Sequence, residues 1–257
     1  MKACLRSRGL ASLLVVAFPV SAILAQSHPH GEQEHGDQEH GTHDRESHSE
    51  SDAGMRHVGA IDHSFADAEA WAERFEGADR DEWQQPDRVV AELALAPGMT
   101  VADIGSGTGY FARRFAEAVG PHGTVFAADV EPEMGAYVRK RADEDDQANL
   151  VPVLASYDDP RLPDGGADLI FICNTWHHIQ DRVEYAKRLA GDLKPGGRIV
   201  VLDFVKGPLP MGPAPEHKLS AEDVTGELLE AGFRLADRFD ELPYQFLLTF
   251  EFSGHAD

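Results

Sequence analysis

Three closely spaced glycines behind an acidic residue are the strongest sign of chemistry in this sequence. The segment "TVADIGSGTGYFARRFA" places Asp103 before Gly105, Gly107 and Gly109. Glycine lets the backbone turn tightly and approach a ligand closely, and the free N–H groups that open a following helix favour a negative group. The segment therefore predicts a loop between a strand and a helix that binds a small charged ligand.

The spacing of these glycines separates two classes of ligand. The Gly-x-Gly-x-Gly pattern differs from the Gly-x-Gly-x-x-Gly that seats a dinucleotide pyrophosphate, and an acidic residue before the loop opposes phosphates but suits an ammonium group. Asp129 ends the next apolar run, "GTVFAADV", where a carboxylate can accept both ribose hydroxyls. A dehydrogenase would use that position too, and the other interpretation of Asp129 is a cap for a helix at Pro132. Together the two features favour a nucleoside with an ammonium group over a nicotinamide cofactor.

Alternating strands and helices are expected to position these residues. Short apolar or β-branched runs predict strands at 99–104, 124–130, 150–154, 167–173 and 198–204. Helical periodicity is expected at 65–75, 86–95, 110–119, 132–145 and 180–193, the last helix being closed by "KPGG". The tail adds a helix and then strands at 233–239 and 245–252. The pattern predicts an α/β, Rossmann-like, doubly wound sheet of seven mostly parallel strands with a C-terminal antiparallel hairpin.

Polar residues after the fourth and fifth predicted strands are candidates for the reaction itself. "FICNTWHHIQD" holds Asn174, His177 and His178, and Asp203 ends the fifth strand. Ligands of open α/β sheets bind at the carboxyl ends of the strands, where these residues would lie. Either histidine could act as a base, since imidazole titrates near neutral pH, and Asp203 could be a base or an orienting carboxylate. The competing interpretation is that the histidines only pack or hydrogen-bond locally.

Taken together, these segments resemble the class I S-adenosylmethionine (SAM)-dependent methyltransferases over about residues 86–204. "VADIGSGTGYFA" is similar to the first motif of that family, and "LKPGGRIVVLDF" is similar to its fifth-strand motif. Within the class the sequence is most similar to the small-molecule branch that includes the ubiquinone and menaquinone biosynthesis methyltransferases. The resemblance implies an enzyme that moves the methyl group of SAM to a small-molecule acceptor.

The resemblance also assigns roles to individual residues. It implies that SAM is held by Asp103, Gly105, Gly107, Gly109, Asp129, Asp158 and Asn174. Asp158 would lie by the adenine amino group, although Asp159 could take that place. Methyl transfer is an in-line displacement, so a base is needed only when the nucleophile holds its proton. His177, His178 or Asp203 would then supply that base.

The charge of the chain limits its partners. Among 257 residues, 23 Lys and Arg stand against 45 Asp and Glu, a formal net charge of -22. Such a chain repels phosphate backbones and anionic lipids, which argues against nucleic acid as a partner. After the fourth strand "NTWH" replaces the Asn/Asp-Pro-Pro-Tyr-like segment of the amino-methylating nucleic-acid enzymes of this class. A small organic acceptor is the remaining expectation, and no segment has the ligand spacing of a fixed metal site.

The first 26 residues have the pattern of a secretory signal peptide. Lys2, Arg6 and Arg8 precede an apolar run over 10–25 with small residues near its end. We expect a periplasmic or secreted protein with no stable membrane insertion after signal cleavage. An uncleaved anchor is the alternative, disfavoured because the run is short and contains Pro19.

A histidine-rich segment, 27–62, separates the signal from the methyltransferase domain predicted at 63–257. It is nearly free of large apolar residues and should be disordered. It could loosely bind Zn, Cu or Ni or be a solvated spacer, and the alternative function is an exported metal-binding protein whose methyltransferase fold is not catalytic. Because SAM is made in the cytosol, export leaves three options open: a domain anchored facing the cytosol, SAM reaching the exported site, or a fold kept for another purpose.

Overall fold

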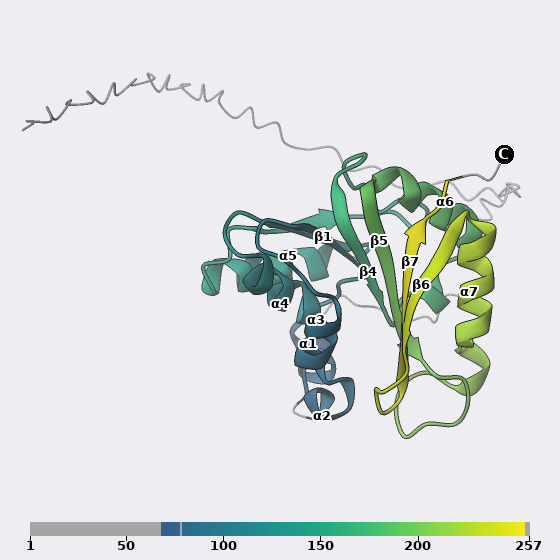
Figure 1. The fold of residues 1–257 in the computed structure, drawn as a ribbon. Coiled ribbons are helices and arrows are strands. Elements are labelled where there is room, and N and C mark those ends of the chain that lie inside the picture. The colour runs from purple at the N-terminus through teal and green to yellow at the C-terminus, as the bar shows by residue number, and fades with distance from the viewer. Residues whose placement is uncertain (1–67, 78, 255–257) are drawn as a thin grey trace, which may run out of the picture. The chain divides into compact units, whose positions relative to one another are not determined.

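A seven-stranded sheet organises the part of the chain described by the computed structural model, residues 68–77 and 79–254. Its strands lie in the order β3-β2-β1-β4-β5-β7-β6 (Figure 1). They are β1 Thr100–Ile104, β2 Thr124–Asp129, β3 Leu150–Leu154, β4 Ala167–Cys173, β5 Leu193–Phe204, β6 Phe233–Phe239 and β7 Gln245–Phe252. Strands β1 to β5 are parallel, whereas β7 runs antiparallel to both β5 and β6. The predicted fold class is confirmed.

Helices cover both faces of this sheet. They are α1 Ala68–Phe75, α2 Arg80–Gln84, α3 Pro86–Glu92, α4 Tyr110–Val119, α5 Pro132–Glu144, α6 Arg182–Asp192 and α7 Ala221–Glu230, with 3-10 turns η1 Trp176–His178 and η2 Pro215–His217. Helices α3, α4 and α5 share one hydrophobic cluster with the sheet, and α6 and α7 share the other. None of the helices within the described ranges is long and apolar enough to cross a membrane.

Alternating side chains of the central strands supply both hydrophobic clusters. In β4, Leu169 and Phe171 pack toward α4, whereas Ile170 and Ile172 pack toward α6. All four are fully buried, as expected for a parallel strand covered on both faces, because successive side chains point to opposite faces. The near-continuous apolar run at 167–173 is therefore a consequence of the central position of β4.

The end of the fourth crossover differs from the prediction. "KPGG" was expected to lie outside the strand as a helix stop, but α6 ends at Asp192 and β5 begins at Leu193. The reason is that Leu193 of β5 already pairs with Ala167 of β4. The register then shifts between Ala167 and Leu169, so that residues 194–197 have no partner in β4, and regular pairing resumes at Arg198. The turn residues are thus a strand irregularity at the amino end of β5, remote from the edge where ligands bind.

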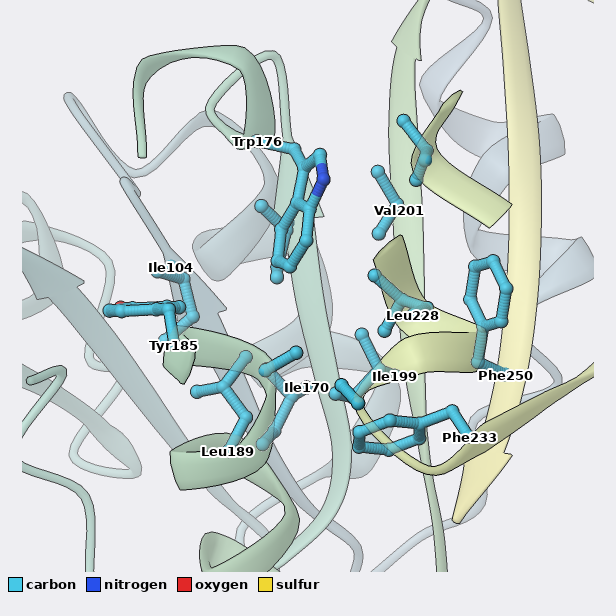
Figure 2. Close-up of a cluster of buried hydrophobic side chains, with 14 of the residues drawn as sticks. Ile104, Ile170, Trp176, Tyr185, Leu189, Ile199, Val201, Leu228, Phe233 and Phe250 are labelled. Carbon is cyan, nitrogen blue, oxygen red and sulfur yellow. The ribbon is translucent and has the colours of Figure 1, made fainter. Parts of the chain in front are cut away.

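Trp176 fixes the turn η1 to the second helical layer. Its indole ring is fully buried in the cluster of Figure 2, and Nε1 donates a hydrogen bond of 2.8 Å to Glu227 of α7. Glu227 also accepts bonds of 2.7–2.9 Å from Arg182 at the start of α6. The residues that directly follow Trp176 are therefore held in place by two helices.

The predicted signal peptide (1–26), the histidine-rich segment (27–62) and the predicted start of the domain at 63 lie outside the described residues. These three assignments, and with them the periplasmic or secreted location and the loose metal binding, stay predictions. Within the described ranges, no group of three or more His, Cys, Asp or Glu side chains is arranged to hold a metal ion.

Two neighbouring leucines on α7 provide a test of this packing. Leu228 is fully buried in the cluster of Figure 2, whereas Leu229 is 51% exposed. Leu228→Ala should lower the free energy of unfolding by about 2–5 kcal/mol because it leaves a cavity. Leu229→Ala, with the same chemistry on the same helix, should change it by less than about 0.5 kcal/mol. Denaturant titration measures both, and equal losses would contradict this orientation of α7.

Candidate functional site

The predicted glycine loop joins β1 to α4, and its backbone conformation requires glycine. Gly105, Gly107 and Gly109 have φ angles of 68°, 52° and 82°. This left-handed region is costly for residues that carry a Cβ atom. A Cβ atom on Gly105 would lie 2.3 Å from Thr175 Oγ1, so the loop packs directly against the segment that follows β4. The strand–loop–helix arrangement predicted from the motif is present.

Asp129 ties the end of β2 to the glycine loop. Its Oδ2 accepts a hydrogen bond of 2.8 Å from Gly107 N, and its Oδ1 accepts one of 3.0 Å from Glu131 N. Each carboxylate oxygen has a second lone pair, so both can still accept from a ligand. In the same loop the hydroxyl of Thr108 is buried and has no hydrogen-bond partner among the described residues. The loop thus offers polar groups beyond those its own folding uses.

Asp103, at the carboxyl end of β1, is a buried acid beside this loop. Burial and the neighbouring Asp129 carboxylate raise the pKa of Asp103 to about 8, while the nearby Arg80 guanidinium opposes that rise. Burial also raises the pKa of Asp129, against the effect of the backbone N–H groups of Glu131 and Gly107. Ionisation of two neighbouring buried carboxyl groups is unfavourable, so a cationic ligand group that binds beside them would stabilise their charged forms.

Asp158 lies away from these contacts. It is exposed in the turn after β3, where it accepts a 2.9 Å hydrogen bond from Ser156 Oγ that lowers its pKa. The alternative, Asp159, accepts from Arg161 N at 2.7 Å and pairs with Arg188 at 3.5 Å. Within the described ranges, neither carboxylate hydrogen-bonds to the glycine loop. The turn nevertheless starts next to Asp129, because Ala155 N donates to Asp129 O at 2.8 Å.

His177 and Asp203 form a buried pair between the ends of β4 and β5. His177 Nδ1 lies 2.9 and 3.0 Å from the two carboxylate oxygens of Asp203, and both side chains are 3–4% exposed. A carboxylate can only accept, so Nδ1 carries the hydrogen and Nε2 is left as an acceptor when the ring is neutral. The predicted third candidate, His178, is exposed, and its ring centroid lies 4.2 Å from that of His177. The structure therefore joins two of the three predicted catalytic residues.

His177, but not Asp203, also lines a small hollow. This hollow, of about 230 Å³, is bounded by residues of η1, α6 and the segment around η2, among them His177, His178, Arg182, Glu216, His217 and Lys218. Lys218 is 3% exposed, its Nζ donates to Gly207 O at 2.9 Å, and burial lowers its pKa against the effect of Asp203. Three histidines, an arginine and a lysine thus stand against one carboxylate, Glu216, among the residues that line this hollow.

Sequence reasoning missed four polar residues of this edge: Arg80, Gln84, Lys218 and Gln245. Gln84, Lys218 and Gln245 are 0–3% exposed. Arg80 and Gln84 come from α2, ahead of the motifs, and Gln245 begins β7. A signal was present in part, because Gln245 is a polar residue at the start of the apolar run "QFLLTF", whereas Gln84 lies in the polar segment "RDEWQQPDR" and gives no such signal. Their partners, however, lie up to 161 positions away in the chain.

The raised pKa of Asp103 predicts a pH dependence of stability. Its ordinary pKa is 3.8 and its pKa in the folded protein is about 8. Between these values the folded state holds a proton that the unfolded state lacks, so the free energy of unfolding should fall as the pH rises from about 4 to about 8. Asp103→Asn removes the titrating group and should flatten this slope in denaturant titrations across that range. Asp129→Asn should flatten it in the same direction, and parallel slopes for wild type and Asp103→Asn would contradict the assignment.

Comparison with known proteins gives the same assignment as the geometry. A protein-family model described as a methyltransferase domain matches residues 101–197. The chain is 35% identical over 121 residues to the ubiquinone/menaquinone biosynthesis C-methyltransferase UbiE of Ectopseudomonas mendocina, covering 46% of this chain and 47% of that protein. The chain thus spans about half the length of the curated relatives that it matches.

Solved structures extend the similarity over more of the chain. A SAM-dependent methyltransferase from Aquifex aeolicus has a TM-score of 0.68 and 27% identity, covering 71% of this chain and 97% of that one. A phosphoethanolamine N-methyltransferase 2 of Haemonchus contortus, solved in complex with S-adenosyl-L-methionine, shares the fold, with a TM-score of 0.53 and 19% identity over 63% of this chain and 39% of that one. With the sheet order, the glycine loop and its two acidic partners, these findings show that the chain carries a methyltransferase domain with the fold of the SAM-dependent methyltransferases.

Proposed function

We propose that this protein transfers the methyl group of SAM to a small-molecule acceptor whose nucleophile must first lose a proton. One observation carries the proposal: His177, whose Nδ1 contacts the buried carboxylate of Asp203, lines a hollow near the carboxyl ends of the strands, the edge at which the glycine loop also lies. The loop supplies the place for the methyl donor, and the pair supplies a base. The small-molecule acceptor is consistent with the UbiE relatives and with the acidic charge of the chain.

The residues at the glycine loop fit SAM. Asp129 presents carboxylate oxygens for the ribose hydroxyls, and the buried acid Asp103 suits the ammonium of the methionyl part. The unpartnered hydroxyl of Thr108 leaves one further polar group for a ligand or a water molecule. When bound, SAM supplies a methyl group on a sulfonium whose leaving group is already activated.

The role of His177 follows from its contact with Asp203. Asp203 holds the ring with Nδ1 protonated, which leaves Nε2 to accept a proton from a ligand in the hollow. Asp203 also accepts a 2.8 Å hydrogen bond from the backbone N of Phe204, which restricts its rotation. As Nε2 takes a proton, the imidazolium that forms is stabilised by the carboxylate. Asp203 therefore acts as the orienting residue and His177 as the base.

Methylation of carbon is the form of this reaction that the relatives favour. The UbiE proteins are named C-methyltransferases. A carbon atom of an enol or a phenol becomes nucleophilic when the adjacent hydroxyl loses its proton. In the proposed reaction that proton would go to His177 Nε2, and the carbon would take the methyl group as the bond between that group and sulfur breaks, which leaves S-adenosylhomocysteine. The C–H proton at the methylated carbon would then pass to water while the oxygen takes a proton back from His177, which restores the enol or the aromatic ring and regenerates the base. The acceptor would thus be a small enolic or phenolic compound.

Cofactor binding tests the first half of the proposal. Calorimetric titration of the full chain with S-adenosylhomocysteine should show binding, and Asp129→Ala should weaken it roughly tenfold or more, because a charged acceptor of two ribose hydroxyls is lost. Asp143→Ala is the matched control, since that carboxylate is exposed on α5. No heat from a folded wild-type sample would overturn the proposal, and unchanged affinity of Asp129→Ala would show that the ribose lies elsewhere.

Turnover tests the base. With methyl-labelled SAM and a panel of small phenols and enols, His177→Gln should lower the rate of methyl transfer by roughly 10²–10⁴-fold, because general base catalysis is removed. Affinity for S-adenosylhomocysteine should remain, since His177 is assigned to the acceptor. His122→Gln, an exposed histidine before β2, controls for the substitution itself. A His177→Gln enzyme with full activity would exclude this residue as the base.

A further inference from the structure

Four polar side chains from three distant parts of the chain are joined in one row of hydrogen bonds. Arg80 Nε donates to Gln84 Oε1 at 2.8 Å, Gln84 Nε2 donates to Gln245 Oε1 at 2.7 Å, and Gln245 Nε2 donates to Asn174 Oδ1 at 2.7 Å. The row runs from α2 through the first residue of β7 to the residue after β4. We call Arg80, Gln84, Gln245 and Asn174 the amide relay.

The arginine at one end determines the direction of every bond in the relay. A guanidinium has only donors, so the oxygen of Gln84 must face Arg80 and its NH₂ must face Gln245. The same reasoning then orients Gln245 and Asn174. Gln84 and Gln245 are 0% and 1% exposed, so a flipped amide would leave buried groups unpaired with no water to replace the lost partner. The oxygen of Asn174 is therefore used within the relay, and its Nδ2 is left as a donor.

Both ends of the relay lie at the glycine loop. Asn174 precedes Thr175, whose side chain occupies the space over Gly105. At the other end, the Arg80 guanidinium lies 3.8 Å from the ring centroid of Tyr110, the first residue of α4. Its positive charge opposes the rise in the pKa of Asp103 that burial and Asp129 cause. The described residues supply acceptors for Arg80 Nε and Nη1 only, and none for Asn174 Nδ2. Two oriented donors, one of them charged, are thus left beside the loop.

We propose that the amide relay holds Asn174 Nδ2 and the Arg80 guanidinium as donors to the carboxylate of the methionyl part of the cofactor. This inference rests on the proposed function. A bound ammonium favours the ionised forms of Asp103 and Asp129, and these ionised carboxylates disfavour a second anion beside them, so the carboxylate of the ligand needs donors on another side of the site. A guanidinium paired with an oriented amide supplies charge-assisted hydrogen bonds there. Arg80 and Gln84 belong to α2, so a segment outside the matched residues 101–197 would take part in binding.

Two ligands that differ by one carboxylate test the relay. S-adenosylhomocysteine carries the carboxylate, and its decarboxylated analogue S-adenosyl-3-thiopropylamine keeps the ammonium, the sulfur and the nucleoside. In the full chain, Asn174→Asp replaces the donor by a second acceptor and should weaken S-adenosylhomocysteine roughly tenfold or more, while the affinity for the analogue stays the same or rises. Calorimetry on both ligands measures this ratio.

Variants of the interior of the relay distinguish orientation from structural support. In Gln245→Glu, the carboxylate at position 245 can only accept hydrogen bonds. Asn174 must then turn its NH₂ group toward that carboxylate and present its oxygen to the ligand. The preference for the carboxylated ligand should therefore be lost. Because a buried charge could unfold the protein, Gln245→Leu and Arg80→Gln serve as uncharged variants, each expected to reduce the preference several-fold. Arg80→Lys keeps an obligate donor and should retain most of it. Thermal denaturation checks that each variant is folded.

The outcomes separate the relay from the cofactor assignment. If wild type binds S-adenosylhomocysteine and the variants weaken both ligands by the same factor, or neither ligand, the relay is only a structural support and the inference is wrong. If a folded wild type binds neither ligand, the proposed function fails and the relay assignment fails with it. A loss confined to the carboxylated ligand supports the inference.

Discussion

The candidate site depends on the close contact between the loop after β1 and the segment after β4. The space that a Cβ atom would fill at Gly105 is taken by Thr175, whose Oγ1 would lie 2.3 Å from that atom. Because β1 and β4 are neighbouring parallel strands, their carboxyl ends meet at one edge, and the missing side chain lets the two loops touch. Asn174 lies on one side of Thr175 and η1 follows on the other. The contact therefore brings to the glycine loop the segment that begins with Asn174 of the amide relay and continues into η1, which carries His177.

Charge is distributed unevenly over this edge. Asp103 and Asp129 lie at the ends of β1 and β2, and burial raises the pKa of each. Arg80 lies near Asp103, and the nitrogen groups of His177 and Lys218 surround the hollow beyond β5. A ligand with a cationic and an anionic end would thus be oriented along the edge by electrostatics alone. Such an arrangement is informative in a chain with a net charge of -22, since its surface in general repels anions.

The fold alone does not establish a reaction, because one fold can carry many functions. The proposal of methyl transfer rests on the combination of groups at this edge, in which the hydrogen-bond partner of a side chain determines whether that side chain can donate or accept. Asp203 orients His177 through a carboxylate that only accepts, and Arg80 orients Asn174 through a guanidinium that only donates. Trp176 and Glu227 anchor η1 to the second helical layer, which keeps His177 in register with Asp203. The site thus uses rigid elements on both faces of the sheet.

Much of this arrangement was determined by the sequence itself. The period of apolar residues predicted the strands. The glycine loop with Asp103 and Asp129 predicted the carboxyl edge of the sheet as the place of a nucleoside ligand, because the loop and both acids directly follow or end predicted strands. His177, His178, Asp203 and Asn174 were also expected at that edge. Asp158 was expected near the cofactor, and among the described residues no hydrogen bond joins its carboxylate to the glycine loop. The sequence could not choose between the two histidines, because that choice depends on burial and on a carboxylate 26 positions away.

Only the tertiary structure decided which distant groups meet. Gln84 and Gln245 are separated by 161 positions. Gln84 lies in α2, a short helix that local patterning did not predict, and Gln245 begins β7, a strand that it did predict. Their contact arises because β7 pairs antiparallel with β5 and brings its first residue to the carboxyl edge, where α2 also lies. Local periodicity carries information about which face a side chain occupies, but not about which other segment covers it. The direction of the amide relay, and with it the role of Arg80, is therefore a property of the folded chain.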